Sequence, residues 1–173
     1  GVTLNNGIDT PFPIYNVIEP GAQAAARLTR NKKIGIIGTR ATVGQRAYLS
    51  VLQRINPEIQ VFQQSCPLLV PLVEEGWVDD PITNLILYRY LSQLLEVGID
   101  TLILGCTHYP ALLTAIRKIT GPNIQLVHSA ESVASLILQG MGTKKILAND
   151  SAQVQKVEIL TTDFPTGRSE EHT

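Results

Sequence analysis

The sequence is poor in cysteine and methionine, with two cysteines and one methionine among 173 residues. Two cysteines are too few for a disulfide framework, so a reducing cytoplasm is the expected location. Basic residues are not in excess, since 14 Lys and Arg stand against 15 Asp and Glu, which argues against a nucleic-acid partner. No apolar run reaches the roughly 18 residues of a membrane span, and the first residues have no signal-peptide pattern. We therefore expect no membrane partner.

The chain instead contains a regular alternation of two patterns. Short runs rich in β-branched residues predict strands, and longer runs with apolar residues three or four positions apart predict helices. This alternation is typical of a parallel sheet flanked by helices, so we predict an α/β fold with a core of its own. The expected strands are residues 14–18, 33–38, 59–62, 101–104 and 124–127, with 157–160 as a weaker candidate, and the expected helices are 22–28, 42–55, 72–74, 81–96, 110–119 and 131–138. Residues 165–173 have the composition of a disordered tail.

The segment Gly105-Cys106-Thr107-His108-Tyr109-Pro110 sets a thiol and an imidazole two positions apart, directly after an expected strand. In open parallel sheets ligands bind beyond the carboxyl ends of the strands, and a helix N-terminus there lowers a thiol pKa from about 8.5. We expect Cys106 to be a reactive thiol rather than a buried structural one, because its neighbours are polar residues in a glycine-bounded turn. His108 is then expected to act as a general acid or base or to orient the site, with a turn residue bonded to the backbone as the alternative.

A second polar group follows the expected strand 33–38. Thr39 and Thr42, with backbone N–H groups at a helix start, could cradle an anion, a carboxylate as readily as a phosphate. A simple capping role for Thr42 explains the same pattern equally well. The segment has neither the Gly-Lys-Ser/Thr of a phosphate-binding loop nor the three spaced glycines of a dinucleotide-binding turn. The sequence therefore does not support nucleotide binding.

Other polar residues have ordinary structural explanations. Cys66 precedes an apolar run and is expected to be a packed core thiol. Glu74 closes a short expected helix, where a solvated carboxylate is usual. His128 and His172 have no partner pattern, and no Cys or His spacing outside the Cys-Thr-His motif resembles a zinc site, so we expect no metal.

Four motifs, in this order along the chain, resemble those of the glutamate racemases. They are Val17-Ile18-Glu19-Pro20-Gly21-Ala22, Ile37-Gly38-Thr39-Arg40-Ala41-Thr42, Cys66-Pro67-Leu68-Leu69-Val70-Pro71-Leu72-Val73-Glu74 and Leu104-Gly105-Cys106-Thr107-His108-Tyr109-Pro110. The segment Ser129-Ala130-Glu131-Ser132-Val133-Ala134 extends the likeness, although the family usually has an aspartate where His128 stands. The resemblance covers nearly all of the chain. It implies an isomerase that makes D-glutamate for peptidoglycan from L-glutamate without a cofactor.

The resemblance does not cover the whole family protein. Members begin with Asp-Ser-Gly and carry Cys-Asn-Thr-Ala-Ser before the segment that matches residues 14–18, and this chain has neither motif and starts with glycine rather than methionine. The family folds as two similar α/β domains with the substrate between them. By this resemblance residues 16–127 form one complete domain. Residues 1–15 and 128–173 are then a remnant of the other, whose missing N-terminal part is an expected partner.

The resemblance also assigns roles to individual residues. Inverting the α-carbon of an amino acid requires one group to remove a proton from one face and another to return a proton on the opposite face, which two thiols can do symmetrically. Cys106 matches one of these thiols, and His108 matches the residue that assists it. The expected substrate-site residues are Thr107, Thr39, Thr42 and Glu74, the last as a partner of either His108 or the substrate ammonium. Since the other thiol has no counterpart, we expect this chain alone to be inactive.

Two other functions remain open at this point. The chain could be a binding module that uses the apolar surface left bare where a partner domain would dock. It could instead belong to a related racemase or decarboxylase that needs only one thiol. A homodimer is also compatible with the sequence.

Overall fold

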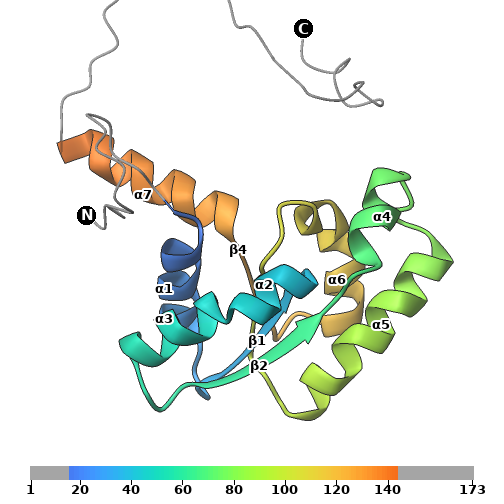
Figure 1. Ribbon diagram of the computed structural model, residues 1–173, viewed down its shortest axis with the longest axis horizontal. Coiled ribbons are helices and arrows are strands. Elements are labelled where there is room, and N and C mark those ends of the chain that lie inside the picture. Colours follow the sequence, from blue (N-terminus) through green and yellow to red (C-terminus); the bar gives the residue numbers. More distant parts are fainter. Residues whose placement is uncertain (1–15, 144–173) are drawn as a thin grey trace, which may run out of the picture.

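The computed structural model describes residues 16–143, which form a four-stranded parallel sheet with helices on both faces (Figure 1). The strand order is β2-β1-β3-β4, with β1 at Lys33–Gly38, β2 at Gln60–Ser65, β3 at Thr101–Leu104 and β4 at Gln125–His128. The helices are α1 Ile18–Leu28, α2 Arg40–Gln45, α3 Ala47–Ile55, α4 Leu69–Glu74, α5 Pro81–Glu96, the 3-10 helix η1 Tyr109–Leu112, α6 Leu113–Thr120 and α7 Ser129–Thr143. The predicted α/β class is confirmed. None of the helices in this range is long and apolar enough to cross a bilayer.

Two apolar layers hold the helices to the sheet because successive side chains of a strand point to opposite faces. On one face, Ile34 and Ile36 of β1 and Ile103 of β3 pack against α1 and α3. On the other face, Leu102 and Leu104 of β3 pack against α4, α5 and α6. The central strands β1 and β3 are therefore buried from both sides, which explains why their sequences are almost wholly apolar.

The prediction of a strand at residues 14–18 is wrong for its described part. Residues 16 and 17 precede a helix that begins at Ile18, and residues 14 and 15 lie outside the described range. The Asn16 side chain accepts hydrogen bonds from the N–H groups of Ile18 and Glu19 at 3.0 and 2.8 Å. Pro20 then falls in the first turn, where its missing N–H costs nothing. Capping by Asn16 outweighs the strand preference of the β-branched pair that follows it.

The expected helix 42–55 is two helices, so this prediction is also wrong. The helical conformation is interrupted at Arg46, which lies between α2 and α3 and has a φ of 53°, in the left-handed region. Helix α2 buries none of its residues, and it contains Gly44, which favours helix poorly. The apolar residues that pack on the sheet begin only in α3, with Tyr48 and Leu52. No core contact therefore keeps α2 in line with α3.

The remaining elements follow the prediction closely. Strands 33–38 and 101–104 and helix 81–96 have the predicted bounds. Strand β2 begins one residue and ends three residues later than predicted, and β4 is shifted by one residue. Helix α4 is longer than expected, and the helix expected at 110–119 is the 3-10 turn η1 followed by α6. The candidate strand 157–160 and the expected tail 165–173 lie outside the described residues.

Asp100 organises the amino-terminal end of the sheet. Its carboxylate accepts a hydrogen bond from the Thr29 hydroxyl at 2.6 Å and from the N–H groups of Arg30 and Asn31, each at 2.7 Å. Burial by itself would raise the pKa of Asp100, but the hydrogen bonds outweigh this effect and lower the pKa below its ordinary value of 3.8. The carboxylate thus ties the turn after α1 to the start of β3.

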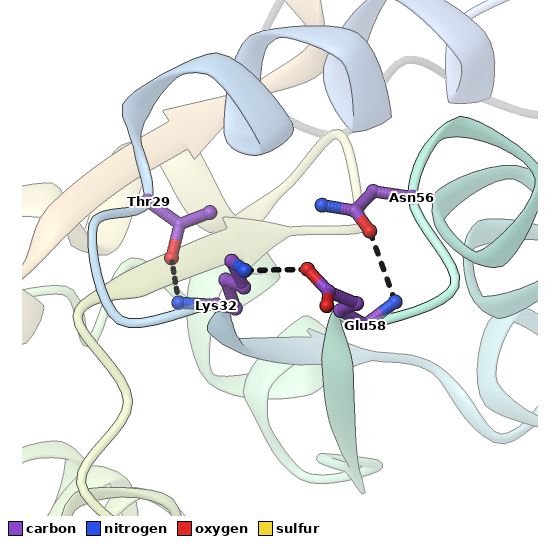
Figure 2. Close-up of polar contacts among 4 residues, drawn as sticks. All are labelled: Thr29, Lys32, Asn56 and Glu58. Atoms are coloured by element: carbon purple, nitrogen blue, oxygen red, sulfur yellow. Dashed lines mark hydrogen bonds and ion pairs between the residues drawn. The ribbon is translucent and has the colours of Figure 1, made fainter.

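Weaker polar contacts lie at the same end of the sheet as Asp100, and Figure 2 shows them. Thr29 Oγ1 accepts a hydrogen bond from the Lys32 N–H at 3.1 Å, and Asn56 Oδ1 accepts one from the Glu58 N–H at 3.0 Å. The Lys32 ammonium pairs with the Glu58 carboxylate, but the two side chains are 50% and 69% exposed. Water screens such a pair, so it contributes little to stability.

We predict that Asp100→Asn lowers the free energy of unfolding of this chain by about 1–2 kcal/mol at neutral pH, since it weakens several hydrogen bonds to one charged acceptor. The folded pKa lies below the unfolded value, so the stabilisation is present above pH 3.8 and is lost as the pH falls through the folded pKa. Urea unfolding at a series of pH values measures this.

The matched control is Glu58→Gln, which removes a solvated ion pair at the same end of the sheet and should leave the unfolding midpoint unchanged. A stability difference between wild type and Asp100→Asn that stays constant down to pH 3 would contradict the role given to the carboxylate.

Candidate active site

The carboxyl ends of β1 and β3 meet at one edge of the sheet because the two strands are parallel neighbours. Ile37 lies opposite Leu104 in the register, and the Gly105 N–H donates to the Ile37 carbonyl at 2.8 Å. The segments that leave these strands, residues 39–42 and 105–110, therefore start side by side. The two polar groups that the sequence singles out come together at this edge.

Glycine at position 105 allows the two loops to approach this closely. A Cβ there would lie 2.9 Å from the Ile37 carbonyl oxygen and 3.2 Å from Thr42 Cγ2. Backbone cannot yield at 2.9 Å without moving one strand away from the other. A Cβ at Gly38 would come as close to Thr42, at 2.9 Å from its Cβ and Cγ2. The Thr42 side chain thus packs over both glycines at once.

A thiol, an imidazole and a carboxylate lie in series on the β3 loop and α4. The Cys106 Sγ is 3.7 Å from His108 Nδ1, and His108 Nε2 is 3.3 Å from Glu74 Oε1. The exposed fractions of the His108 and Glu74 side chains are 26% and 58%, and Cys106 is half-buried. All three residues are therefore at least partly open to solvent.

This order of groups defines what the imidazole can do. A carboxylate at Nε2 favours the tautomer with its proton on that nitrogen, which leaves Nδ1 free to accept the proton of the thiol. With both nitrogens protonated, the ring instead donates to a thiolate. Either state makes Cys106 a group that can give and take a proton. The interpretation of Glu74 as a partner of His108 is thus supported by a direct contact.

The Thr39 side chain is the cap of α2, so the alternative in which Thr42 only caps the helix is wrong. Thr39 Oγ1 accepts a hydrogen bond from the Thr42 N–H at 3.2 Å, and the two hydroxyl oxygens lie 3.0 Å apart. The Thr42 hydroxyl donates to the Gly105 carbonyl at 3.4 Å. Thr42 therefore links the β1 loop to the loop that carries Cys106. Thr107 is exposed in that second loop.

Cys66 is a packed core thiol, as predicted. It is 0% exposed, its N–H donates to the Gly38 carbonyl at 2.8 Å, and its thiol donates to the Gln64 carbonyl at 3.6 Å. Burial raises the pKa of this thiol to about 12. The two cysteines of the chain thus follow parallel strands but differ in exposure.

Two contacts near the sheet edge were not found from the sequence. The Tyr109 hydroxyl donates to the Cys66 carbonyl at 3.2 Å, and no local pattern signals a partner so far away in the chain. His128 does have a partner, since its Nε2 lies 3.1 Å from Glu131 Oε2 in the first turn of α7. The spacing of three residues on a helix start could have signalled this pair. His172 lies outside the described residues.

Two cavities flank β4, with volumes of about 530 and 260 Å³. They share Leu126, His128 and Glu131 in their linings, and neither includes the side chains of Cys106, His108 or Glu74. Among residues 16–143, no three His, Cys, Asp or Glu side chains form a group that could hold a metal ion. The chemistry-bearing groups therefore lie at the carboxyl ends of the strands, outside these two cavities.

Comparison of the sequence with known families gives one match over most of the chain. Residues 9–137 match the Asp/Glu/hydantoin racemase family. A protein from Geobacter metallireducens named glutamate racemase is 43% identical over 156 residues, which cover 90% of this chain and 57% of that protein. The chain thus spans little more than half the length of this curated relative.

Solved structures give the same picture. A glutamate racemase isoform from Bacillus anthracis superimposes with a TM-score of 0.75 and 36% identity, covering 81% of this chain and 53% of that one. A glutamate racemase from Francisella tularensis, solved in complex with D-glutamate, superimposes with a TM-score of 0.71 and 32% identity, covering 79% and 50%. The described sheet and its helices correspond to about half of each of these proteins.

We predict that iodoacetamide modifies Cys106 at least about a hundred times faster than Cys66 near pH 8. Cys66 is fully buried, and a pKa of about 12 leaves only about one molecule in ten thousand as thiolate at that pH. Peptide mass spectrometry of timed samples measures both rates in the same chain.

Denaturing urea is the control, because it should bring the two rates within a few-fold of each other. Equal rates in the native protein would contradict the packed environment of Cys66. An unreactive Cys106 would remove it as a proton-transfer group.

Proposed function

The chain belongs to the Asp/Glu/hydantoin racemase family, and we propose that it carries one half of the active site of a glutamate racemase, which interconverts L- and D-glutamate. The observation that carries this proposal is the series of contacts from Cys106 to His108 and from His108 to Glu74 at the carboxyl edge of a parallel sheet. The 43% identity to a protein named glutamate racemase, and the likeness to a structure that holds D-glutamate, favour glutamate as the substrate.

In the proposed reaction Cys106 exchanges a proton with the α-carbon from one face. As thiolate it takes the proton, so that the Cα–H bond breaks and an S–H bond forms, and the electron pair stays on the carbon and its carboxylate. A second thiol on the opposite face gives a proton to the carbon, which inverts its configuration. In the reverse direction the two thiols exchange roles. No electron is gained or lost overall, so no redox partner is needed, and we propose that no cofactor takes part.

His108 and Glu74 assist the proton transfer at Cys106. A carboxylate at Nε2 holds the imidazole so that Nδ1 faces the thiol, at 3.7 Å. The ring then accepts the thiol proton when a base is needed and returns it when an acid is needed. We assign His108 as the general acid and base that assists Cys106, and Glu74 as the group that orients it.

The hydroxyls near Cys106 are proposed to bind the substrate carboxylates and ammonium. Thr39 and Thr42 lie at the start of α2, next to the loop that carries Cys106, and the bond from Thr42 to the Gly105 carbonyl links the two segments. Thr107 is exposed beside the thiol. A carbanion-like intermediate needs hydrogen bonds to its carboxylate and the exclusion of water, and fixed hydroxyls and N–H groups can provide the former.

We assign the second thiol and the opposite wall of the site to a part of the protein outside this chain. The chain spans 57% of its Geobacter metallireducens relative, and its three chemical groups approach a substrate from one side only. In this proposal residues 16–127 are one racemase domain, and residues 1–15 and 128–173 belong to the other.

The D-glutamate would serve peptidoglycan synthesis, and so cell-wall biogenesis and cell shape.

Two unpaired cysteines fit a reducing compartment, and we propose a cytoplasmic enzyme on that ground. A homodimer remains part of the proposal as a state to be measured by light scattering.

We predict that this chain alone does not interconvert L- and D-glutamate. A longer protein that joins this chain to the part of a relative's sequence that the chain does not span, called the united protein below, should interconvert them. Cys106→Ser in the united protein should lower kcat by about 10²- to 10⁴-fold, the range for loss of a positioned acid or base. Circular dichroism of glutamate solutions follows turnover from either enantiomer.

Cys66→Ala is the matched control and should keep kcat within about threefold, because the Cys66 thiol is buried away from solvent. Turnover by this chain alone that Cys106→Ser abolishes would refute the proposal of a shared site. Full activity of the united Cys106→Ser protein would refute the role of the thiol.

A further inference from the structure

The Tyr109 phenol connects the loop that carries Cys106 to a distant part of the chain. Tyr109 is 0% exposed and packs in the apolar cluster between the sheet and α5. Its hydroxyl donates to the Cys66 carbonyl at 3.2 Å. A buried hydroxyl without a partner is costly, so this bond holds the phenol and the carbonyl together.

The Cys66 carbonyl lies where the chain leaves β2 and turns into α4. The Cys66 N–H donates to the Gly38 carbonyl at 2.8 Å, and the Cys66 carbonyl also accepts a bond from the Leu69 N–H at 3.2 Å. The bond from Tyr109 therefore acts on the peptide that starts α4. Moving this carbonyl would move the first turn of the helix.

Helix α4 is short, and only two of its residues anchor it in the core. It has six residues and no side-chain cap, and it buries only Leu69 and Val73. Its last residue, Glu74, is the one that meets His108. His108, in the loop after β3, thus meets the last residue of α4, and Tyr109, at the start of η1, bonds to the turn that precedes α4.

We propose that Tyr109, through its hydroxyl, is a positioning residue for the Cys106–His108 pair. By tying the start of α4 to the loop, it sets where the Glu74 carboxylate meets the imidazole and hence how the ring faces the thiol. The chemistry served by this arrangement rests on the proposed racemase function. The geometry itself is a property of this chain. Tyr109→Phe tests the hydroxyl alone, because the ring that fills the core remains.

The first experiment measures the rate at which iodoacetamide modifies Cys106 in this chain, in wild type, Tyr109→Phe, Glu74→Gln and the double variant. We expect Tyr109→Phe to change the rate by at least about threefold in the same direction as Glu74→Gln. The double variant should match Glu74→Gln alone, because two changes that act through one contact do not add. Tyr90→Phe removes a phenol hydroxyl that packs against the same cluster and should leave the rate unchanged.

The second experiment uses the united racemase described above. Tyr109→Phe should lower kcat by about tenfold and leave KM within about twofold, as expected when an outer partner of a catalytic group is lost. A purely structural role would instead lower the unfolding midpoint and leave both the modification rate and kcat of the folded protein unchanged. A wild-type protein without racemase activity, but with the non-additive modification rates, would refute the proposed function alone.

The positioning role is overturned if Tyr109→Phe leaves the Cys106 rate unchanged or if its effect multiplies with that of Glu74→Gln. Should Tyr109→Phe fail to fold, hydrogen exchange of the wild type decides. The amides of α4 and η1 should then open as one unit. Independent opening of α4 would show that the Tyr109 bond does not hold the helix and would overturn the proposal.

Discussion

The close parallel pairing of β1 and β3 is the constraint on which the site depends. Strand β1 ends in Gly38 and strand β3 is followed by Gly105, whose N–H bonds to the Ile37 carbonyl at a point where a Cβ could not fit. The two loops that follow can therefore lie side by side, and Thr42 bridges them with its methyl group and its hydroxyl. Two buried strands, covered by helices on both faces, supply the rigidity that keeps this edge in place.

The two cysteines show how the same topological position gives different chemistry. Both lie at or just beyond the carboxyl end of a strand, yet Cys66 is sealed with its pKa raised to about 12, whereas Cys106 is half-buried beside an imidazole. The difference comes from their neighbours. Cys66 leads into the apolar helix α4, which covers it, and Cys106 leads into a polar turn before η1. Exposure, rather than the strand end itself, separates a structural thiol from a candidate proton carrier.

The direction from which these groups act also bears on how much of its relatives the chain spans. Cys106, His108 and Glu74 come from the loop after β3 and the end of α4, so in the proposed reaction they face the substrate from one direction. Inversion of a carbon centre needs groups on two opposite faces. A chain that corresponds to about half of the Bacillus anthracis and Francisella tularensis glutamate racemases carries, in our proposal, one of those faces. The proposed shared site thus follows from the stereochemistry of the reaction as well as from the comparison.

By itself the sequence determined the fold class, the bounds of β1, β3 and α5, and the motif that carries Cys106 and His108, because periodicity and turn chemistry act over a few neighbouring residues. The end of α2 at Arg46 and the capping of α1 by Asn16 depended on which residues found core contacts or caps, and these were misjudged. Only the tertiary structure decided that Glu74 meets His108 and that Tyr109 bonds to Cys66. These pairs are far apart in the chain, and the order of parallel strands, which no local pattern encodes, brings them together.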